Sequence, residues 1–267
     1  MLGACGITSE QRKEMAQSES VLAPLLRRMD PREAAQWAAD PYDADKRGRG
    51  TTMLANAPFG GADAYLEMYR KYVTDESPGV RAAAARGLGM HGSPSDVPLV
   101  TPLLKDSERL VRLDAVKALQ RLHNEAAVVP LIDAVDPKKE VEVDVRAGAA
   151  SALGQYADPK VLDALIAALA EDNLLVTRSA QESLRTLTGN DELGDDRKGW
   201  VRWMAATRTP FAGRRAYFYP VFSRDRVWMD WVPIVGGPVP NETSAQPAGM
   251  PAIVDVASGD GAVQPGK

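Results

Sequence analysis

Two histidines, His91 and His123, are the residues best suited to acid–base or metal chemistry in this chain of 267 residues. They lie one apparent repeat apart, and each follows the end of an expected helix. A histidine can act as a general base or bind a metal, but no third histidine and no cysteine pair is present to complete a metal site. The dipole of a helix also favours a cationic imidazole at its C-terminus, which is sufficient to explain both positions. We therefore expect no metal site and no cofactor.

Motifs of other enzyme classes are absent from the sequence. There is no Gly-x-Ser-x-Gly elbow, no phosphate-binding Walker loop, no His-Glu-x-x-His and no calcium loop of the EF-hand type. We therefore expect no catalytic residues and predict that the protein is not an enzyme.

The single cysteine, Cys5, ends the tetrapeptide Leu2-Gly3-Ala4-Cys5. This tetrapeptide resembles a bacterial lipobox, in which the cysteine thiol carries a diacylglycerol. Residues 1–9 would then form a short tether, and the protein would be a lipoprotein of the bacterial cell envelope, held at the membrane only through the lipid on Cys5. The alternative is a free cysteine near the end of a cytoplasmic protein.

Composition excludes several classes of protein. The chain has 32 basic and 36 acidic residues, a net charge of −4, so it lacks the basic excess that binding to a phosphate backbone requires. Nucleic acid is therefore not an expected partner. A hydrophobic share of 45% is sufficient for a folded core. No stretch approaches the roughly 18 consecutive apolar residues of a membrane-spanning helix.

One pattern recurs four times in the middle of the chain, at intervals of 31 to 34 residues. Each copy is a helix rich in small residues, and the copies begin at Val80-Arg81, Val111-Arg112, Val145-Arg146 and Val176-Thr177. A second apolar segment with helical spacing precedes each copy, at residues 62–73, 97–104, 126–135 and 161–169. Each unit is therefore predicted to be a helical hairpin, and small residues on one helix face allow neighbouring hairpins to pack closely.

Capping residues support these boundaries. Asp96, Asn124 and Asp158 are expected N-caps, and Gly89 and Gly154 are expected to end helices.

The pattern resembles the HEAT repeat family, including the short lyase-type repeats of bacteria. The resemblance rests on the signature Val-Arg-x-x-Ala-x-x-Ala/Gly-Leu and on an aspartate in the preceding turn, at Asp75, Asp106, Asp136 and Asp172. It implies an all-α solenoid in which turn aspartates and second-helix arginines of adjacent units form a ladder of hydrogen bonds. An insertion at residues 138–142 and the replacement of arginine by Thr177 depart from the pattern and weaken this expectation toward the C-terminal end.

Three enzyme families with similar architecture provide contrasts. Deoxyhypusine hydroxylase carries repeated His-Glu pairs, and this chain has no His-Glu dipeptide. The HEAT-like alkylpurine DNA glycosylases present a basic face to DNA, whereas this chain is acidic overall. Bilin lyases also resemble this fold, but nothing in this chain except the repeats points to a tetrapyrrole ligand. A lyase-type enzyme remains an alternative that would require a bound cofactor or a cluster of groups with shifted pKa.

The ends of the chain extend this organisation. The predicted solenoid spans residues 31–190 and includes a degenerate first hairpin with Lys46-Arg47 in place of Val-Arg. Residues 10–30 are predicted to form an N-terminal capping helix. Residues 191–235 are predicted to contain a capping helix with Trp200 and Trp203, followed by an aromatic and arginine-rich segment at 211–231 that is either partly buried or a binding strip. The tail, residues 236–267, is predicted to be disordered.

This architecture predicts a protein-interaction scaffold. Stacked hairpins curve, and their second helices line a concave surface suited to an extended peptide or to a helix of another protein. The first alternative is a soluble cytoplasmic adaptor or chaperone-like binder. The second alternative is the lyase-type enzyme. The predicted contact residues are the outward polar positions Arg86, Asp114, Lys117, Arg121, Ser151, Gln155, Arg178 and Arg185.

Overall fold

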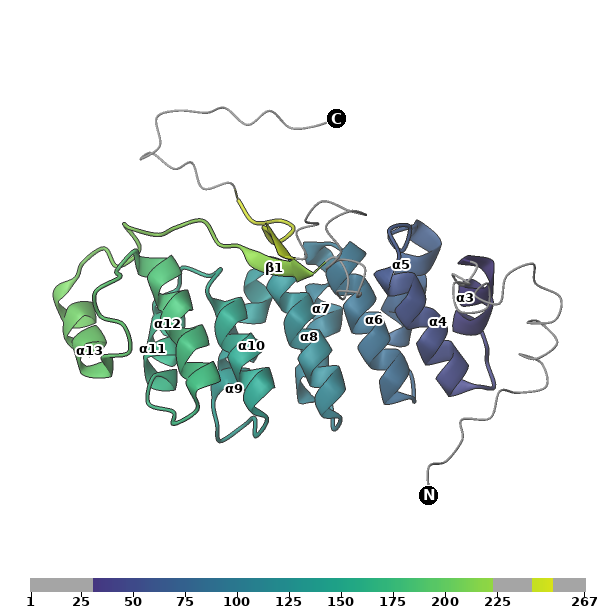
Figure 1. Ribbon diagram of the computed structural model, residues 1–267, viewed down its shortest axis with the longest axis horizontal. Coiled ribbons are helices and arrows are strands. Elements are labelled where there is room, and N and C mark those ends of the chain that lie inside the picture. The colour runs from purple at the N-terminus through teal and green to yellow at the C-terminus, as the bar shows by residue number, and fades with distance from the viewer. Residues whose placement is uncertain (1–30, 223–241, 252–267) are drawn as a thin grey trace, which may run out of the picture.

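The computed structural model describes residues 31–222 and 242–251, which form an elongated row of helical hairpins (Figure 1). The first helices of the hairpins are α3 (Pro31–Ala38), α5 (Asp63–Tyr72), α7 (Val97–Val100), α9 (Val128–Val135) and α11 (Pro159–Ala168). The second helices, here called B helices, are α4 (Ala44–Asn56), α6 (Pro78–His91), α8 (Arg109–Arg121), α10 (Val143–Leu153) and α12 (Leu174–Thr188). Three 3-10 helices flank α7 and α9: η1 (Pro94–Asp96), η2 (Thr101–Lys105) and η3 (Glu125–Ala127). The predicted all-α solenoid is confirmed.

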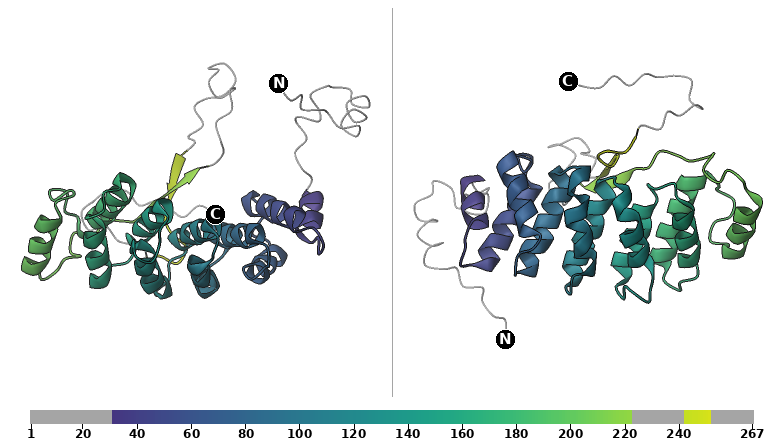
Figure 2. Two further views of the ribbon diagram at one scale, coloured as in Figure 1. Left: turned by 90° about the horizontal axis from the view of Figure 1, so that it is seen from below. Right: turned by 180° about the vertical axis from the view of Figure 1, so that it is seen from behind.

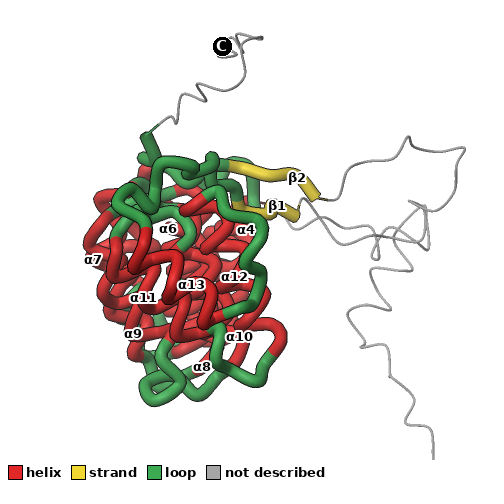
Figure 3. Tube along the Cα trace, turned by 90° about the vertical axis from the view of Figure 1, so that its left-hand side faces the viewer, coloured by secondary structure: helices red, strands yellow, loops and turns green. Residues whose placement is uncertain are grey.

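The hairpins form two layers. The B helices pack in order, α4 on α6, α6 on α8, α8 on α10 and α10 on α12. Viewed along the row, α9 and α11 lie on one side and α10 and α12 on the other (Figure 3). Figure 2 shows the same row from below and from behind. Val80, Val111, Val145 and Val176 are fully buried in the core between the layers. The valine of each repeated Val-Arg or Val-Thr pair therefore anchors a B helix in that core.

Two of the predicted helix ends differ in detail. Gly89 lies inside α6, which continues to His91, and its missing side chain allows α8 to approach closely. Asp96 precedes α7 as predicted, but its side chain forms no capping bond to that helix; instead it completes a capping box with Ser93, the N-cap of η1. Asn124 and Asp158 are N-caps as predicted, and each side chain accepts a bond from a backbone N–H two residues further on.

A ladder of arginine–carboxylate pairs runs along the edge formed by the turns inside the hairpins. The pairs are Arg47–Asp75 (2.9 Å), Arg81–Asp106 (2.7 Å), Arg112–Glu140 (2.7 Å) and Arg146–Glu171 (2.9 Å). None of these side chains is more than 16% exposed, so the pairs are largely shielded from water. Each arginine also donates through Nη1 to a backbone carbonyl of its own turn. The ladder therefore joins each hairpin to the next and also braces each turn.

The ladder extends further than the sequence pattern suggested, and two of the expected turn acids are wrong. Glu140 and Glu171 take the places predicted for Asp136 and Asp172. The ladder stops only at Thr177, whose hydroxyl donates to the backbone carbonyl of Glu171 (3.1 Å).

Aspartates paired with arginine predict a loss of stability in acid: Asp75 and Asp106 of the ladder, and Asp96, which pairs with Arg70 at 2.7 Å. Burial opposes ionisation of Asp75, Asp96 and Asp106, but bonds from an arginine and from a backbone N–H outweigh it, so the pKa of each lies below its usual value. Because the pKa in the unfolded chain is higher, about 3.9, the stability contributed by the ionised form is complete above that value and is lost as the pH falls through the native pKa. We expect urea midpoints to fall in acid, with a smaller fall for Asp106→Asn. A midpoint independent of pH in acid would contradict this prediction.

The C-terminal part of the chain closes the row and then returns across it. Helix α13 (Arg197–Ala206) packs against α11, and Trp200 is fully buried in the core. The chain then runs back to strands β1 (Tyr219–Phe222) and β2 (Glu242–Ala245), which pair antiparallel (Figure 1). Residues 207–222 and 242–251 are here called the strap. The prediction of disorder from residue 236 is wrong for residues 242–251, whereas residues 1–30, with the predicted tether and capping helix, lie outside the described residues.

Candidate protein-binding face

The predicted contact residues were expected on the outward surface of the B helices, here called the B-helix face. Lys117 on α8 and Arg178 on α12 are exposed there, and neither forms an ion pair with a described residue. Arg185 is partly buried and lies 2.8 Å from both Glu182 and Asp191. Lys117 and Arg178 are therefore the predicted cations best placed to meet a partner.

Asp114 does not face solvent as the helical spacing predicted. It is only 2% exposed, and both carboxylate oxygens accept from Arg86 Nη2, at 2.9 and 3.2 Å. Burial raises the pKa of Asp114, although the charges of Arg86 and Lys117 act in the opposite direction. Asp114 therefore holds Arg86 in place and cannot itself be a surface contact.

The strap covers three other predicted contact residues. Its Tyr217 is buried; the hydroxyl donates to the carbonyl of Ser151 (2.8 Å) and accepts from Gln120 Nε2 (3.0 Å). Arg214 Nη2 donates to the carbonyl of Gln155, which is fully buried (2.7 Å). The outward position predicted for Gln155 is therefore wrong, because this side chain is buried beside the strap, whereas Ser151 remains partly exposed next to Tyr217.

Arg121 is also engaged by the strap. Its guanidinium lies 5.6 Å from the centre of the Tyr219 ring, a cation–π contact. Its backbone carbonyl accepts from the N–H of Ala248 (2.8 Å), whose own carbonyl accepts from the N–H of His123 (2.9 Å). Burial lowers the pKa of Arg121. Arg121 therefore fixes the strap to the end of α8 and is not a free contact residue.

The strap contact can be tested at Tyr217. Tyr217→Phe removes both hydrogen bonds of the hydroxyl while keeping the ring, so we expect a loss of about 1–2 kcal/mol in the free energy of unfolding. We also expect faster amide hydrogen exchange at Ala248 and Arg215, whose N–H groups bond to the helices. Tyr42→Phe is the control, because Tyr42 is 96% exposed. Equal exchange in both variants would mean that the tyrosine does not hold the strap.

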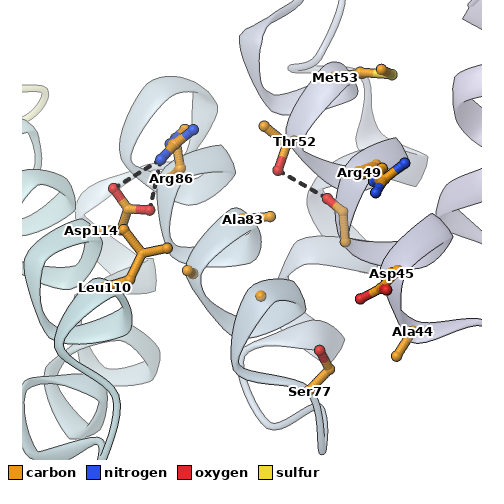
Figure 4. A pocket seen from close by; sticks show the side chains of 13 residues that line it. Ala44, Asp45, Arg49, Thr52, Met53, Ser77, Ala83, Arg86, Leu110 and Asp114 are labelled. Carbon is orange, nitrogen blue, oxygen red and sulfur yellow. Dashed lines mark hydrogen bonds and ion pairs between the residues drawn. The ribbon is translucent and has the colours of Figure 1, made fainter. Parts of the chain in front are cut away.

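The uncovered part of the B-helix face contains a groove of about 450 Å³ over α6 (Figure 4). Gly79, Ala82 and Ala83 of α6 line it between walls from α4 and α8. These walls include two apolar side chains, Met53 of α4 and Leu110 of α8, which are 37% and 53% exposed. Two arginines, Arg49 and Arg86, and two aspartates, Asp45 and Asp114, also line the groove. The groove thus combines a floor of small residues, apolar side chains and charged side chains of both signs.

Comparison with known proteins identifies the repeats. The family model for HEAT repeats matches three overlapping stretches, residues 33–120, 66–144 and 97–185, and so more than half of the chain. The chain belongs to the HEAT-repeat family. The solved structure of Escherichia coli YibA is similar, with 19% sequence identity and a TM-score of 0.49, over 73% of this chain and 74% of that chain. No curated protein sequence matches.

HEAT repeats commonly mediate protein–protein binding, so this array is a helical scaffold capable of protein interaction. Among the residues that the structure describes, no helix is long and apolar enough to cross a membrane. The same residues contain no group of three or more His, Cys, Asp and Glu side chains that could hold a metal ion.

The two histidines of the HEAT array have separate partners. His91 Nε2 lies 2.8 Å from the carbonyl oxygen of Ala55. His123 stacks on Tyr156, with ring centres 4.9 Å apart, and its Nδ1 lies 3.0 Å from Gln155 Oε1. Both N–H groups of the Gln155 amide have backbone acceptors, so Oε1 accepts and Nδ1 of His123 carries the proton. Each imidazole therefore contacts a residue of a neighbouring hairpin.

Sequence reasoning missed the groove, although its signal is present in the repeats. Counted from the Val-Arg or Val-Thr pairs, Gly79 is equivalent to Leu110 and Asp144, so α6 has no side chain where α8 and α10 have one. A missing side chain at an outward position marks a hollow between neighbouring helices.

Proposed function

We propose that this HEAT array is a non-enzymatic scaffold that binds a partner protein on the part of the B-helix face left open by the strap. The groove over α6 is the observation that carries the proposal, because it is a hollow of this face lined by both apolar and charged side chains. Lys117 extends the same surface, because it follows Asp114 by one helical turn on α8 and is exposed. The structural hydrogen bonds of His91 and His123 support a role without catalysis.

Site-specific photo-crosslinking tests this proposal. A photoreactive amino acid placed at Lys117 in the full chain, in the cells that produce it, is expected to form adducts with a small set of proteins. The control position is Lys71, which is also exposed but lies on α5 outside the B-helix layer. Identical adducts at both positions, or none at Lys117, would contradict a binding role for this face.

We also propose that the scaffold is anchored in a bacterial cell envelope through a lipid on Cys5. The support is the lipobox-like tetrapeptide, which lies outside the described residues. The intact mass of the N-terminal peptide from the native organism, with detergent phase partitioning, tests this proposal against Cys5→Ser. An unmodified N-terminus and partitioning into the aqueous phase would instead support the cytoplasmic adaptor.

A further inference from the structure

We propose that residues 252–256, which follow the strap, dock in a pocket at the edge of the array opposite the ladder, where the carboxylate of Asp255 pairs with Arg214. These residues lie outside the described part of the chain. The inference goes beyond the proposed function, because it concerns how the strap is held on the helices. Three features lead to it: an arginine without a carboxylate partner, the course of the strap, and the residue pattern of the segment.

The pocket lies where the hairpins connect to one another. It has a volume of about 540 Å³, and the connections after α8 and α10 supply much of its lining. This lining includes His123 and Tyr156, whose rings stack on each other. Both parts of the strap also line the pocket, through Arg214 and Pro251. An occupant can therefore contact two hairpins and the two parts of the strap together.

Arg214 is a cation whose hydrogen bonding is incomplete. Its Nη2 donates to the carbonyl of Gln155 (2.7 Å), and its buried Nε has no partner. Its Nη1 forms no hydrogen bond, and the guanidinium forms no ion pair, with a described residue. Burial lowers the pKa of Arg214, as expected for a cation without a neighbouring anion. A carboxylate that reaches Nη1 would supply the missing charge partner.

The net charge of the pocket does not select an occupant. Lys160 and Arg214 line it together with two acids, Glu125 and Asp158. Asp158 already caps α11, where its carboxylate accepts from the N–H of Lys160 (2.8 Å), and Glu125 is exposed to water. Selection of a carboxylate therefore depends on one guanidinium and not on an excess of basic residues.

The strap runs toward this pocket along the array. A Cβ on Gly249 would lie 2.3 Å from Cγ of Pro94, after α6, and 3.4 Å from the carbonyl oxygen of His123, after α8. Two residues later, Pro251 lines the pocket together with residues that follow α10. The strap therefore passes from one connection to the next, and its last described residue is already at the pocket.

Asp255 is within reach of Arg214. It is the first acidic residue after the strap, and it follows Pro251 by four residues. Four residues of extended chain span up to about 13 Å, and Arg214 and Pro251 line the same pocket. The segment can therefore form the pair without rearrangement of the strap.

The residue pattern of the segment matches the pocket. Residues 252–256 are Ala-Ile-Val-Asp-Val, and their β-branched side chains favour an extended chain. Successive side chains of an extended chain point to opposite sides, so Ile253 and Asp255 share one face. Val129, which lines the pocket, is 60% exposed. With Asp255 on Arg214, Ile253 faces the same lining and covers apolar surface there.

Amide hydrogen exchange of the full chain tests the proposal. The reporters are the N–H groups of Ala248 and His123, whose bonds, at 2.8 and 2.9 Å, hold the end of the strap on α8. Asp255→Asn removes the charge and keeps the size, so we expect exchange at both to become about fivefold faster, the equivalent of about 1 kcal/mol. Asp260→Asn, the next acid along the chain, is the matched control and should change exchange by less than about twofold, because a distant exposed charge is screened. Equal effects of the two variants would overturn the proposal.

A double-mutant cycle identifies the partner of Asp255. Arg214→Met also removes the bond to Gln155, so its own effect on the strap does not identify that partner. In the Arg214→Met chain, Asp255→Asn is expected to cause no further increase in exchange, because the interaction it removes is already lost. An undiminished effect of Asp255→Asn in that chain would overturn the pairing.

Disulfide trapping locates the segment. In a Cys5→Ser chain, Val129→Cys and Ile253→Cys place one thiol on the pocket lining and one on the segment, and mild oxidation is expected to join them within one molecule. The control adds Asp255→Asn, which should slow formation about fivefold, because a segment that is tethered but not docked meets the pocket less often. Equal rates in the two chains, or no disulfide in either, would overturn the placement of Ile253.

An anion from solution is the competing partner for Arg214. If inorganic phosphate slows exchange at Ala248 while Asp255→Asn leaves it unchanged, Arg214 binds a free anion and the assignment to residues 252–256 is wrong. If phosphate has no effect on the unsubstituted chain but slows exchange in the Asp255→Asn chain, the carboxylate of Asp255 already occupies the site, as proposed.

Discussion

Arg112→Met is expected to lower the free energy of unfolding by about 3–5 kcal/mol, the range for breaking a buried ion pair by removal of one partner. The substitution leaves Glu140, which is only 4% exposed, without its cation. It also removes the Nη1 donor from the carbonyls of Asp106 and Ser107, at 2.8 and 3.1 Å. Methionine keeps an unbranched side chain of similar length, so the loss reports mainly on charge and hydrogen bonding. Urea unfolding followed by far-UV circular dichroism measures it.

Arg109→Met is the matched control for this prediction. Arg109 lies on the same helix and pairs with Asp144 and Glu142, but it is 53% exposed. Water screens such a pair and can replace its hydrogen bonds, so we expect a much smaller change. If the two variants lose similar stability, the ladder is not a special source of cohesion between hairpins.

The repeat architecture could be predicted because its causes are local. Helical spacing of apolar residues, small residues at the packing face and the Val-Arg step each concern residues within one or two turns. The same logic located the degenerate first hairpin, in which Arg47 forms the ladder pair with Asp75 although no valine precedes it.

The turn acids were mispredicted because residue type was given priority over spacing. Glu140 and Glu171 lie six residues before Arg146 and Thr177, as Asp75 lies before Arg81. That spacing matters because the residue at this position has two roles. Its carbonyl accepts from the side chain six residues later, and its carboxylate accepts from the arginine of the preceding hairpin. Both aspartate and glutamate can perform these two roles.

Partial burial of the aromatic segment was one of the two expected outcomes, and Tyr217 confirms it for the described part. The path of the strap could not be predicted, because its contacts are distant in sequence and partly made by the main chain. Gln120 and Tyr217 are 97 residues apart. Ala248 is placed by backbone bonds at the end of α8, and such bonds do not depend on residue type. A composition rich in Pro, Gly, Ser and Ala therefore predicted disorder where the structure has order. The burial of Asp114 is similar, because it depends on Arg86 of the neighbouring repeat.

Gly89→Ala is expected to lower the free energy of unfolding by about 2–3 kcal/mol, in the upper range for overpacked cores. The added Cβ would lie 2.6 Å from Cα and 2.8 Å from Cβ of Ala118. Because these atoms belong to or adjoin the backbone of α8, relief requires α6 and α8 to separate, and each displacement disturbs the Arg81–Asp106 link between the same hairpins.

The same substitution at Gly48 is expected to act in the opposite direction. Gly48 lies inside α4, and a Cβ there would meet its nearest atom, the carbonyl carbon of Gly79, at an ordinary 3.5 Å. Alanine reduces the conformational entropy of the unfolded chain, so Gly48→Ala is expected to raise the free energy of unfolding by about 0.5–1 kcal/mol. Helix propensity alone predicts a gain at both positions. A loss at Gly89 with a gain at Gly48, measured by urea unfolding, therefore isolates the close contact between repeats, and a gain at both would show that the junction of α6 and α8 tolerates a wider spacing.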